Sequence, residues 1–367
     1  MAEITRDNIL AALKGIALPG AAQDIVEAGL VRGLVVRDGH VGFVLEVDAA
    51  QAPRLEPLRQ ACEAAVKRVG GVKAATVVLT AEKAAPKMPQ PQAAEKPGIP
   101  GVGAIIAVAS GKGGVGKSTT AVNLALALKA LGLAVGLLDA DIYGPSIPKM
   151  LGISGRPSQR ADKKILPMMN YGMPCMSIGF LVAEGTATVW RGPMVMGALQ
   201  QLMHDVAWND KGDLDILVID LPPGTGDAQL TIVQRVPLAG AVIVSTPQDI
   251  ALIDAAKGID MFNKVNVPIL GIIENMSYFL CPHCGERSDI FGHGGARDTA
   301  TKIDVPFLGE VALHMDIRET SDSGNPVVVS APESAHARAY LAIARKVVDE
   351  MAASAGAGAA APKIIFD

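Results

Sequence analysis

Residues 104–119 read Ala-Ile-Ile-Ala-Val-Ala-Ser-Gly-Lys-Gly-Gly-Val-Gly-Lys-Ser-Thr, an apolar run that leads into a glycine-rich loop. A helix-like run from Thr119 to Leu131 follows. This order of strand, loop and helix is the context that the pattern G-x-x-x-x-G-K-[ST] requires. Glycines let backbone N–H groups converge on the β-phosphate, and the helix N-terminus adds the positive end of its dipole. The stretch therefore predicts a phosphate-binding loop (P loop) that binds a nucleoside triphosphate.

The predicted nucleotide contacts lie in the loop itself. Lys117 is expected to meet the β- and γ-phosphates, and the hydroxyl of Ser118 is expected to ligate Mg²⁺. The full predicted set is Gly111, Gly113, Gly114, Val115, Gly116, Lys117, Ser118 and Thr119.

Acidic residues at the ends of two predicted strands extend this site. Asp220 ends the apolar run 214–220 and fits the carboxylate that helps to hold Mg²⁺ in a P-loop enzyme. Asp139 and Asp141 end the strand after the P-loop helix, and we expect Asp139 near the metal and Asp141 orienting the attacking water. The loop 221–227 is expected to sense the γ-phosphate. The alternative for all three acids is that they cap the helices that follow.

Repeated apolar runs predict the fold class. The runs 104–109, 134–138, 214–220, 241–245 and 269–274, with 307–311 as a further candidate, alternate with helical segments. Near-continuous apolar strands are buried on both faces, as in a mostly parallel sheet flanked by helices. The sequence predicts an α/β P-loop NTPase fold.

Four segments are expected along the chain. Residues 1–80 carry a hairpin signal, a helical pattern and a further strand, which indicates a small α+β domain. Residues 81–100 contain five prolines and predict a linker. The ATPase domain is expected over 101–350, and 351–367 form an Ala/Gly-rich tail.

Composition excludes several classes of protein. The 367 residues carry a net charge of −4 and no block of basic residues, so no nucleic-acid partner is expected. Neither a secretory signal nor an apolar stretch long enough for a membrane span is evident, so no membrane partner is expected. Four cysteines do not form a disulfide framework, and a reducing, cytoplasmic setting is predicted.

The second informative stretch is Cys281-Pro-His-Cys-Gly285, a C-x-x-C turn. Such a turn directs N–H groups at thiolate sulfurs and suits Zn²⁺ or the iron of an iron–sulfur cluster. A closed thiolate site needs four ligands, and Cys62 and Cys175 each lie alone in the sequence. Two chains that each donate Cys281 and Cys284 would complete it. The alternatives are a zinc site that recruits His283 or His293, a redox pair, and an unligated pair. His204 and His314 show no pattern and are assigned no role.

The P loop resembles the deviant Walker A motif of the MinD/Mrp/NifH-type dimeric ATPases, whose signature lysine matches Lys112. The resemblance implies ATP as the nucleotide, a homodimer, and a Lys112 that reaches the partner's nucleotide and stabilises transition-state charge. The segments 139–141 and 220–226 resemble the switch I and switch II of these proteins. Asn275 lies where relatives read adenine, although an Asn after a strand is also a common turn residue.

With the C-x-x-C turn, the segment 101–345 resembles the Mrp/ApbC-type iron–sulfur cluster carriers. The N-terminal module resembles the accessory domain of iron–sulfur assembly proteins. It lacks the usual Asp-Pro-Glu over 16–24 and a cysteine in the expected loop, which favours a docking role. The resemblance implies a slow ATPase that holds a [4Fe–4S] cluster between two pairs of Cys281 and Cys284 and delivers it to apoproteins. The alternatives are a positioning ATPase, disfavoured by a tail with one lysine beyond Met351, and a zinc-stabilised regulatory ATPase.

Overall fold

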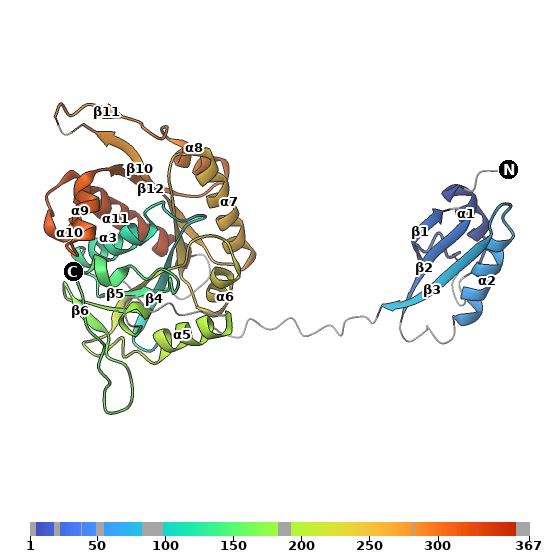
Figure 1. Cartoon of the computed structure of the whole chain (residues 1–367), viewed down its shortest axis with the longest axis horizontal. Helices are drawn as coiled ribbons and strands as arrows, with labels where there is room; N and C mark the ends of the chain where they lie inside the picture. The colour runs from blue at the N-terminus through green and yellow to red at the C-terminus, as the bar shows by residue number, and fades with distance from the viewer. Residues whose placement is uncertain are drawn as a thin grey trace. The chain divides into compact units, whose positions relative to one another are not determined.

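The structure is a computed structural model that describes residues 5–17, 23–37, 39–48, 55–82, 98–182, 192–281 and 283–356. The chain divides into two compact units, Met1–Ala94 and Glu95–Asp367 (Figure 1). Most of the predicted linker, residues 83–97, and the end of the predicted tail, residues 357–367, lie outside the described residues. The predicted segment boundaries stay a prediction.

The first unit is a small α+β module. Its sheet has the order β1-β2-β3, with β1 antiparallel to β2 and β2 parallel to β3. The helix α2 connects β2 to β3 and buries Leu58, Cys62 and Val66, which recur at helical spacing on one face. This confirms the α+β class predicted for the N-terminal module. The elements are α1 (Arg6–Leu13), β1 (Val31–Arg37), β2 (His40–Asp48), α2 (Glu56–Lys67) and β3 (Ala74–Glu82).

The second unit is built on a nine-stranded sheet, in the order β11-β10-β9-β4-β8-β5-β7-β6, with β12 also paired to β10. All pairs are parallel except β6 with β7 and β10 with β11. The strands are β4 (Val102–Ala109), β5 (Val135–Asp139), β6 (Met168–Asn170), β7 (Met173–Ser177), β8 (Leu214–Asp220), β9 (Gly240–Ser245), β10 (Ile269–Leu280), β11 (Arg287–Ser288) and β12 (Phe307–Leu313).

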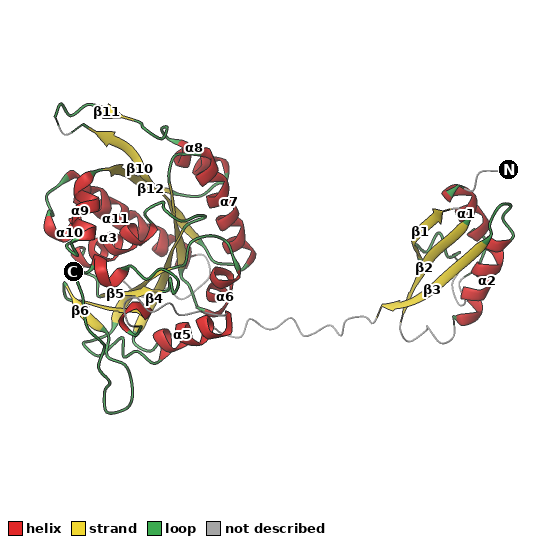
Figure 2. Cartoon of the chain, viewed as in Figure 1, coloured by secondary structure: helices red, strands yellow, loops and turns green. Residues whose placement is uncertain are grey.

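Helices cover both faces of this sheet (Figure 2). The helices α3 and α11 pack on each other and on the sheet, while α7 packs against β9 and β10. Among the described helices, none is both long and apolar enough to traverse a lipid bilayer. The helices are α3 (Lys117–Ala130), α4 (Ile147–Met150), α5 (Gly192–His204), α6 (Asp227–Arg235), α7 (Asp249–Lys264), α8 (Gly295–Lys302), α9 (Met315–Asp322), α10 (Val327–Ser330) and α11 (Ala335–Gly356), with a 3-10 turn η2 (Ile178–Phe180).

The predicted parallel α/β fold is confirmed, and the apolar runs named above form β4, β5, β8, β9, β10 and β12. The structure adds β6, β7 and β11, and it extends β10 to Leu280. Because proline cannot donate to a ladder, Pro174 within β7 concealed that strand in the sequence. Beyond Glu274 the strand contains the polar residues Asn275 and Ser277, which are buried nonetheless. An apolar pattern could not indicate this part of the strand.

Candidate nucleotide and metal site

The P loop joins β4 to α3 at the carboxyl edge of the sheet. Several of its glycines have backbone angles or close neighbours that do not tolerate a side chain. Gly114 and Gly116 have φ of 81° and 80°, which side chains disfavour. A Cβ on Gly116 would lie 2.1 Å from Nδ2 of Asn275, and one on Gly111 would lie 2.2 Å from the backbone carbon of Asp254. The loop therefore requires glycine at these positions.

The first turn of α3 is open to an anion. Gly116 precedes the helix and offers no side chain to cap it, and the first turn contains no acidic residue. Its N–H groups thus lack side-chain acceptors of the usual capping kind. Together with the helix dipole, they suit a phosphate, as the motif predicts.

Lys117 is held inside this site rather than at the surface. Its side chain is only 6% exposed, and its ammonium pairs with the carboxylate of Asp220, which is fully buried. It also donates to the Ser118 hydroxyl at 3.2 Å. The predicted phosphate lysine and the predicted metal residues are therefore brought together from segments far apart in the sequence.

Two carboxylates meet beside Lys117. Asp139 of β5 and Asp220 of β8 are register partners at the ends of adjacent strands, and both are fully buried. Burial, and then the negative charge of Asp220, raises the pKa of Asp139 to about 7. Burial also raises the pKa of Asp220, and Lys117 offsets part of that effect. Bringing two acids so close in a buried place is unfavourable unless a cation joins them.

The donor set fits Mg²⁺. Oδ2 of Asp220 is buried and has no hydrogen-bond partner among the described residues, so it is available to a ligand. Carboxylate and hydroxyl oxygens are hard donors, which Mg²⁺ prefers. Ser118 and Asp220, with Asp139 nearby, would hold the ion next to the phosphates.

Asp139 also shapes switch I, the segment 139–146. Its Oδ2 accepts from the Ser177 hydroxyl at 2.9 Å and from the backbone N–H of Ile147 at 3.3 Å. Its Oδ1 accepts from the N–H of Asp141 at 3.1 Å. Three bonds to one carboxylate orient the whole loop, so the alternative of a helix cap holds in part, since Ile147 begins α4.

Asp141 lies in the wall of a cavity between the two switch segments. The cavity has a volume of about 380 Å³. Asp141 is partly exposed and accepts from the N–H of Gly144 at 3.3 Å. Its predicted role in orienting water stays a prediction, and its position beside the second switch is compatible with that role. The lining residues are Asp141, Tyr143, Gly144, Pro222, Pro223, Gly226 and Gln229.

Switch II, the segment 220–226, is hydrogen-bonded to the end of β4, where the P loop begins. The N–H of Gly224 donates to the carbonyl of Ser110 at 3.0 Å, and that of Leu221 donates to the carbonyl of Val108 at 3.0 Å. These bonds hold the start of switch II beside the P loop.

Asn275 is placed under the P loop. Its amide nitrogen donates to the carbonyl of Val115 at 2.8 Å, and its side chain is 6% exposed. This contact gives the residue a supporting role that the sequence did not indicate. Adenine reading by Asn275 stays a prediction.

Lys112 has its side chain free. It is partly exposed and forms no ion pair in the part of the chain that the structure describes. Only its backbone carbonyl is used, as acceptor of the Ser110 hydroxyl at 2.9 Å. Its predicted contact with the partner's nucleotide stays a prediction.

Cys281 and Cys284 lie in the turn of a hairpin made by β10 and β11. The N–H of Cys281 donates to the carbonyl of Glu286 at 2.9 Å, and the N–H of Gly285 donates to the carbonyl of Cys281 at 2.8 Å. Backbone N–H groups of His283 and Cys284 hydrogen-bond to the Cys281 sulfur and lower the pKa of its thiol. This is the arrangement that a metal thiolate needs.

Side chains at the base of the hairpin fix its direction. The Arg287 guanidinium lies 4.2 Å from the centre of the Tyr278 ring. It also pairs with Asp289 at 2.9 Å and with Glu310 of β12 at 3.7 Å. The hairpin is thereby anchored to the sheet, and Figure 1 shows β11 and the end of β10 that leads to it projecting from the sheet.

One chain does not complete a metal site at this turn. Among the described residues, no His, Asp or Glu forms a three-ligand group with Cys281 and Cys284. His293, the candidate for a zinc ligand, instead lies 2.7 Å from the Arg287 guanidinium through its Nδ1. Cys62 and Cys175 are fully buried.

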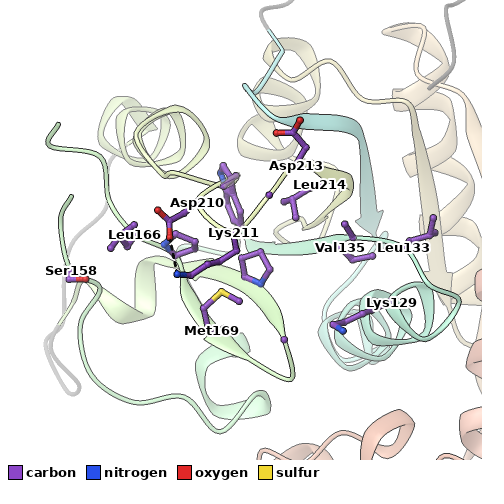
Figure 3. Close-up of a pocket in the computed structure, with 16 residues that line it drawn as sticks. Lys129, Leu133, Val135, Ser158, Leu166, Met169, Asp210, Lys211, Asp213 and Leu214 are labelled. Atoms are coloured by element: carbon purple, nitrogen blue, oxygen red, sulfur yellow. Dashed lines mark ion pairs between the residues drawn. The ribbon is translucent and has the colours of Figure 1, made fainter. Parts of the chain in front are cut away.

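A second cavity, of about 360 Å³, opens at the opposite edge of the sheet, where β5 and β8 begin (Figure 3). Its wall includes Lys129 of α3, Trp208 and the ion pair of Lys211 with Asp210 at 3.6 Å. None of the described residues that line it is a predicted nucleotide contact. This cavity is therefore separate from the predicted nucleotide contacts at the carboxyl edge of the sheet.

The fold and the site define a P-loop nucleotide-binding protein with an exposed two-cysteine turn. Comparison with known proteins makes this specific. Residues 101–348 match the family model described as NUBPL iron-transfer P-loop NTPase, and residues 6–78 match that of an iron–sulfur cluster assembly protein. The chain belongs to the NUBPL iron-transfer P-loop NTPase family.

Three similar proteins are named as iron–sulfur cluster transfer or carrier proteins. The mouse iron–sulfur cluster transfer protein NUBPL is 58% identical over 262 residues, which is 71% of this chain and 81% of that protein. An iron–sulfur cluster carrier protein of Synechocystis is 44% identical over 360 residues, 96% of this chain and 99% of that protein. The carrier protein of Escherichia coli K12 is 52% identical over 299 residues, 81% and 78% of the two chains.

Solved structures show the same fold. A nucleotide-binding protein from Archaeoglobus fulgidus, in complex with ADP and with Co found in it, is 41% identical, with a TM-score of 0.56. The match covers 64% of this chain and 90% of that one. The cell division ATPase MinD of Pyrococcus furiosus, at 24% identity and a TM-score of 0.51, covers 67% of this chain and 99% of that one and shows the fold alone.

Proposed function

We propose that this protein is an ATP-dependent iron–sulfur cluster carrier. Its cargo is a [4Fe–4S] cluster held between Cys281 and Cys284 of one chain and the same pair of a second chain, and the recipients are apo iron–sulfur proteins. The observation that carries the proposal is the C-x-x-C turn. N–H groups already point at a thiolate there, and no third ligand from the described part of the same chain is in reach.

The nucleotide in this proposal is ATP with Mg²⁺. Lys117 and the first turn of α3 hold the phosphates, and Ser118 with Asp220 holds the ion. Asp141 orients the attacking water, and Lys112 of the opposite chain neutralises charge as the γ-phosphate leaves. Lys112, which is partly exposed and has no ion pair among the described residues, and Lys117, which is buried and paired, support this division of roles.

Coupling between nucleotide and cargo follows from symmetry. A cluster shared by two chains lies on their two-fold axis, and a Lys112 that reaches across that axis favours one dimer geometry while ATP is bound. Hydrolysis removes that preference. Nucleotide state then changes how exposed the cluster is to a recipient.

The proposal also covers the compartment of the protein and the role of its N-terminal unit. All four cysteines are free thiols, which suits a reducing compartment, and we assign the protein to the cytoplasm. In the N-terminal unit the one cysteine, Cys62, is buried in the core, so that unit would act as a docking surface rather than a metal site.

Metal analysis tests this function. Full-length protein is reconstituted anaerobically with iron and sulfide, and iron, acid-labile sulfide and zinc are measured per dimer. We expect about four irons and four sulfides, and their loss in Cys281→Ser/Cys284→Ser. Stoichiometric zinc without sulfide would instead make this a zinc-stabilised ATPase.

A further inference from the structure

Three side chains outside the nucleotide site bring metal-ligating atoms together: His314, Asp316 and His336. One atom from each lies within 4.8 Å of the other two. His314 precedes α9, Asp316 lies in its first turn, and His336 lies in the first turn of α11. The short helix α10 packs on both α9 and α11 and so closes the chain into this arrangement.

The lone pairs of this group are suitably placed. Nδ1 of His314 accepts the backbone N–H of Asp316 at 3.2 Å, so this nitrogen carries its lone pair rather than a proton, and an ion bound there would take the place of that hydrogen bond. The same nitrogen lies 3.5 Å from Oδ2 of Asp316. The rings of His314 and His336 have their centres 4.4 Å apart, and a ring nitrogen of each lies within 4.8 Å of a carboxylate oxygen of Asp316.

No fixed cation of the described residues occupies this place. Asp316 is 64% exposed, and in the described part of the chain no lysine or arginine pairs with its carboxylate, which has the His314 imidazole as its basic neighbour. The nearest arginine in the sequence, Arg318, pairs instead with Glu319 at 3.1 Å and Asp322 at 3.5 Å. The carboxylate is therefore free to ligate an ion.

A second group of the same size, Glu274, His293 and Glu310, is already neutralised. Glu274 accepts from the Ser277 hydroxyl at 2.6 Å and from the N–H of Ala296 at 2.7 Å. The second glutamate pairs with Arg297 at 2.8 Å and Arg287 at 3.7 Å. Because two guanidinium groups already neutralise Glu310, the group of Glu274, His293 and Glu310 is a structural network and not a candidate metal site.

We propose that His314, Asp316 and His336 bind one divalent transition-metal ion, with water completing the coordination. Two imidazole nitrogens and one carboxylate oxygen select Zn²⁺, Co²⁺ or Fe²⁺ over Mg²⁺ and Ca²⁺, which prefer oxygen alone. Ligand bonds of about 2.0–2.2 Å place ligand atoms roughly 3.4 Å apart. The separation of 3.5 Å between His314 and Asp316 is already close to that value.

An ion here joins the start of α11 to the junction of β12 and α9. The helix α11 packs against α3, which begins with the phosphate lysine. Binding of the ion to the folded state alone therefore raises the melting temperature of the second unit.

The test uses the full-length, nucleotide-free chain with Cys281→Ser/Cys284→Ser, so that no metal binds the cysteine turn. Zn²⁺ is titrated in by calorimetry, and Co²⁺ binding is followed by its visible absorption. We expect one ion per chain and a nitrogen/oxygen spectrum without thiolate charge transfer. Loss of even an outer partner of a metal site costs roughly 10–100-fold in affinity, so His336→Ala should weaken binding at least tenfold.

Two further variants make the test decisive. Asp316→Asn changes an exposed side chain, should leave the fold intact and should also weaken Zn²⁺ at least about tenfold. His293→Ala, in the neutralised group, should leave the affinity unchanged. The proposal is overturned if the parent binds no Zn²⁺, or if Asp316→Asn and His336→Ala bind it as the parent does.

Discussion

At the scale of single residues, the nucleotide site stores unfavourable charge in a buried place. Asp139 and Asp220 are fully buried, and Lys117 is the cation that balances one of them. Removing one member of a buried pair leaves an uncompensated charge, which is costlier than removing both. Removing one of these charges should therefore change the free energy of unfolding of the ligand-free protein.

The first prediction concerns Lys117→Ala. At pH 8 we expect a loss of about 3 kcal/mol in the free energy of unfolding, the low end for a broken buried pair. The loss should shrink toward pH 5, because burial already raises the pKa of Asp220 and protonation removes its charge. Urea denaturation at both pH values measures it. Lys211→Ala is the control, since this lysine is 76% exposed and its pair is worth little.

The second prediction concerns Asp139, whose pKa burial raises from 3.8 to about 7. Between these values the folded state keeps a proton that the unfolded state releases. The contribution of Asp139 to the free energy of unfolding is thus greatest at low pH and falls as pH rises through about 7.

Asp139→Asn cannot titrate and should lose this dependence. Its stability should improve relative to the parent as pH rises from about 4 to about 7, measured in urea with EDTA and without nucleotide. A difference that stays constant over that range would contradict the assignment of the raised pKa to this residue.

The third prediction separates two roles for Asn275. As a support of the P loop, Asn275→Ala leaves the Val115 carbonyl buried and unpaired, so ATP and GTP should both bind about tenfold more weakly. As a reader of adenine, it would weaken ATP far more than GTP. Fluorescent-nucleotide titration distinguishes them, and Asn263→Ala on the exposed side of α7 is the matched control.

At the scale of elements, local motifs were readable from the sequence and tertiary contacts were not. The P loop, its helix and the apolar parallel strands follow from spacing and periodicity within short windows. The contact of Asn275 with Val115 joins residues 160 positions apart, which no local pattern predicts. The hairpin of β10 and β11 likewise depends on Arg287 meeting Tyr278 and Glu310. His314 was assigned no role because its partner His336 belongs to another helix.

The fourth prediction concerns accessibility of the thiols in these elements. Cys62 and Cys175 are fully buried, and burial raises the pKa of their thiols to about 11 and about 12. Iodoacetamide at neutral pH should modify only Cys281 and Cys284 in the metal-free protein, as followed by peptide mass spectrometry. Modification of Cys175 at the same rate would contradict its position in β7, and urea-unfolded protein is the control.

At the scale of the whole molecule, each unit has its own hydrophobic core, and the two cores share no residue. The nucleotide residues and the cysteine turn both belong to the second unit, and β10 carries Asn275 in its middle and leads into Cys281. One strand thus runs from the P loop to the cysteine turn. The sequence predicted both sites but not the strand that joins them. The apolar run ends at Glu274, and the polar residues that follow gave no sign that β10 continues to Leu280.

Native mass spectrometry of the anaerobically reconstituted protein shows directly whether one cluster is shared by two chains. We expect a dimer whose mass exceeds two chains by one [4Fe–4S] cluster, and monomers without metal for Cys281→Ser/Cys284→Ser. A monomer that carries a whole cluster, or a dimer that carries only zinc, would contradict it.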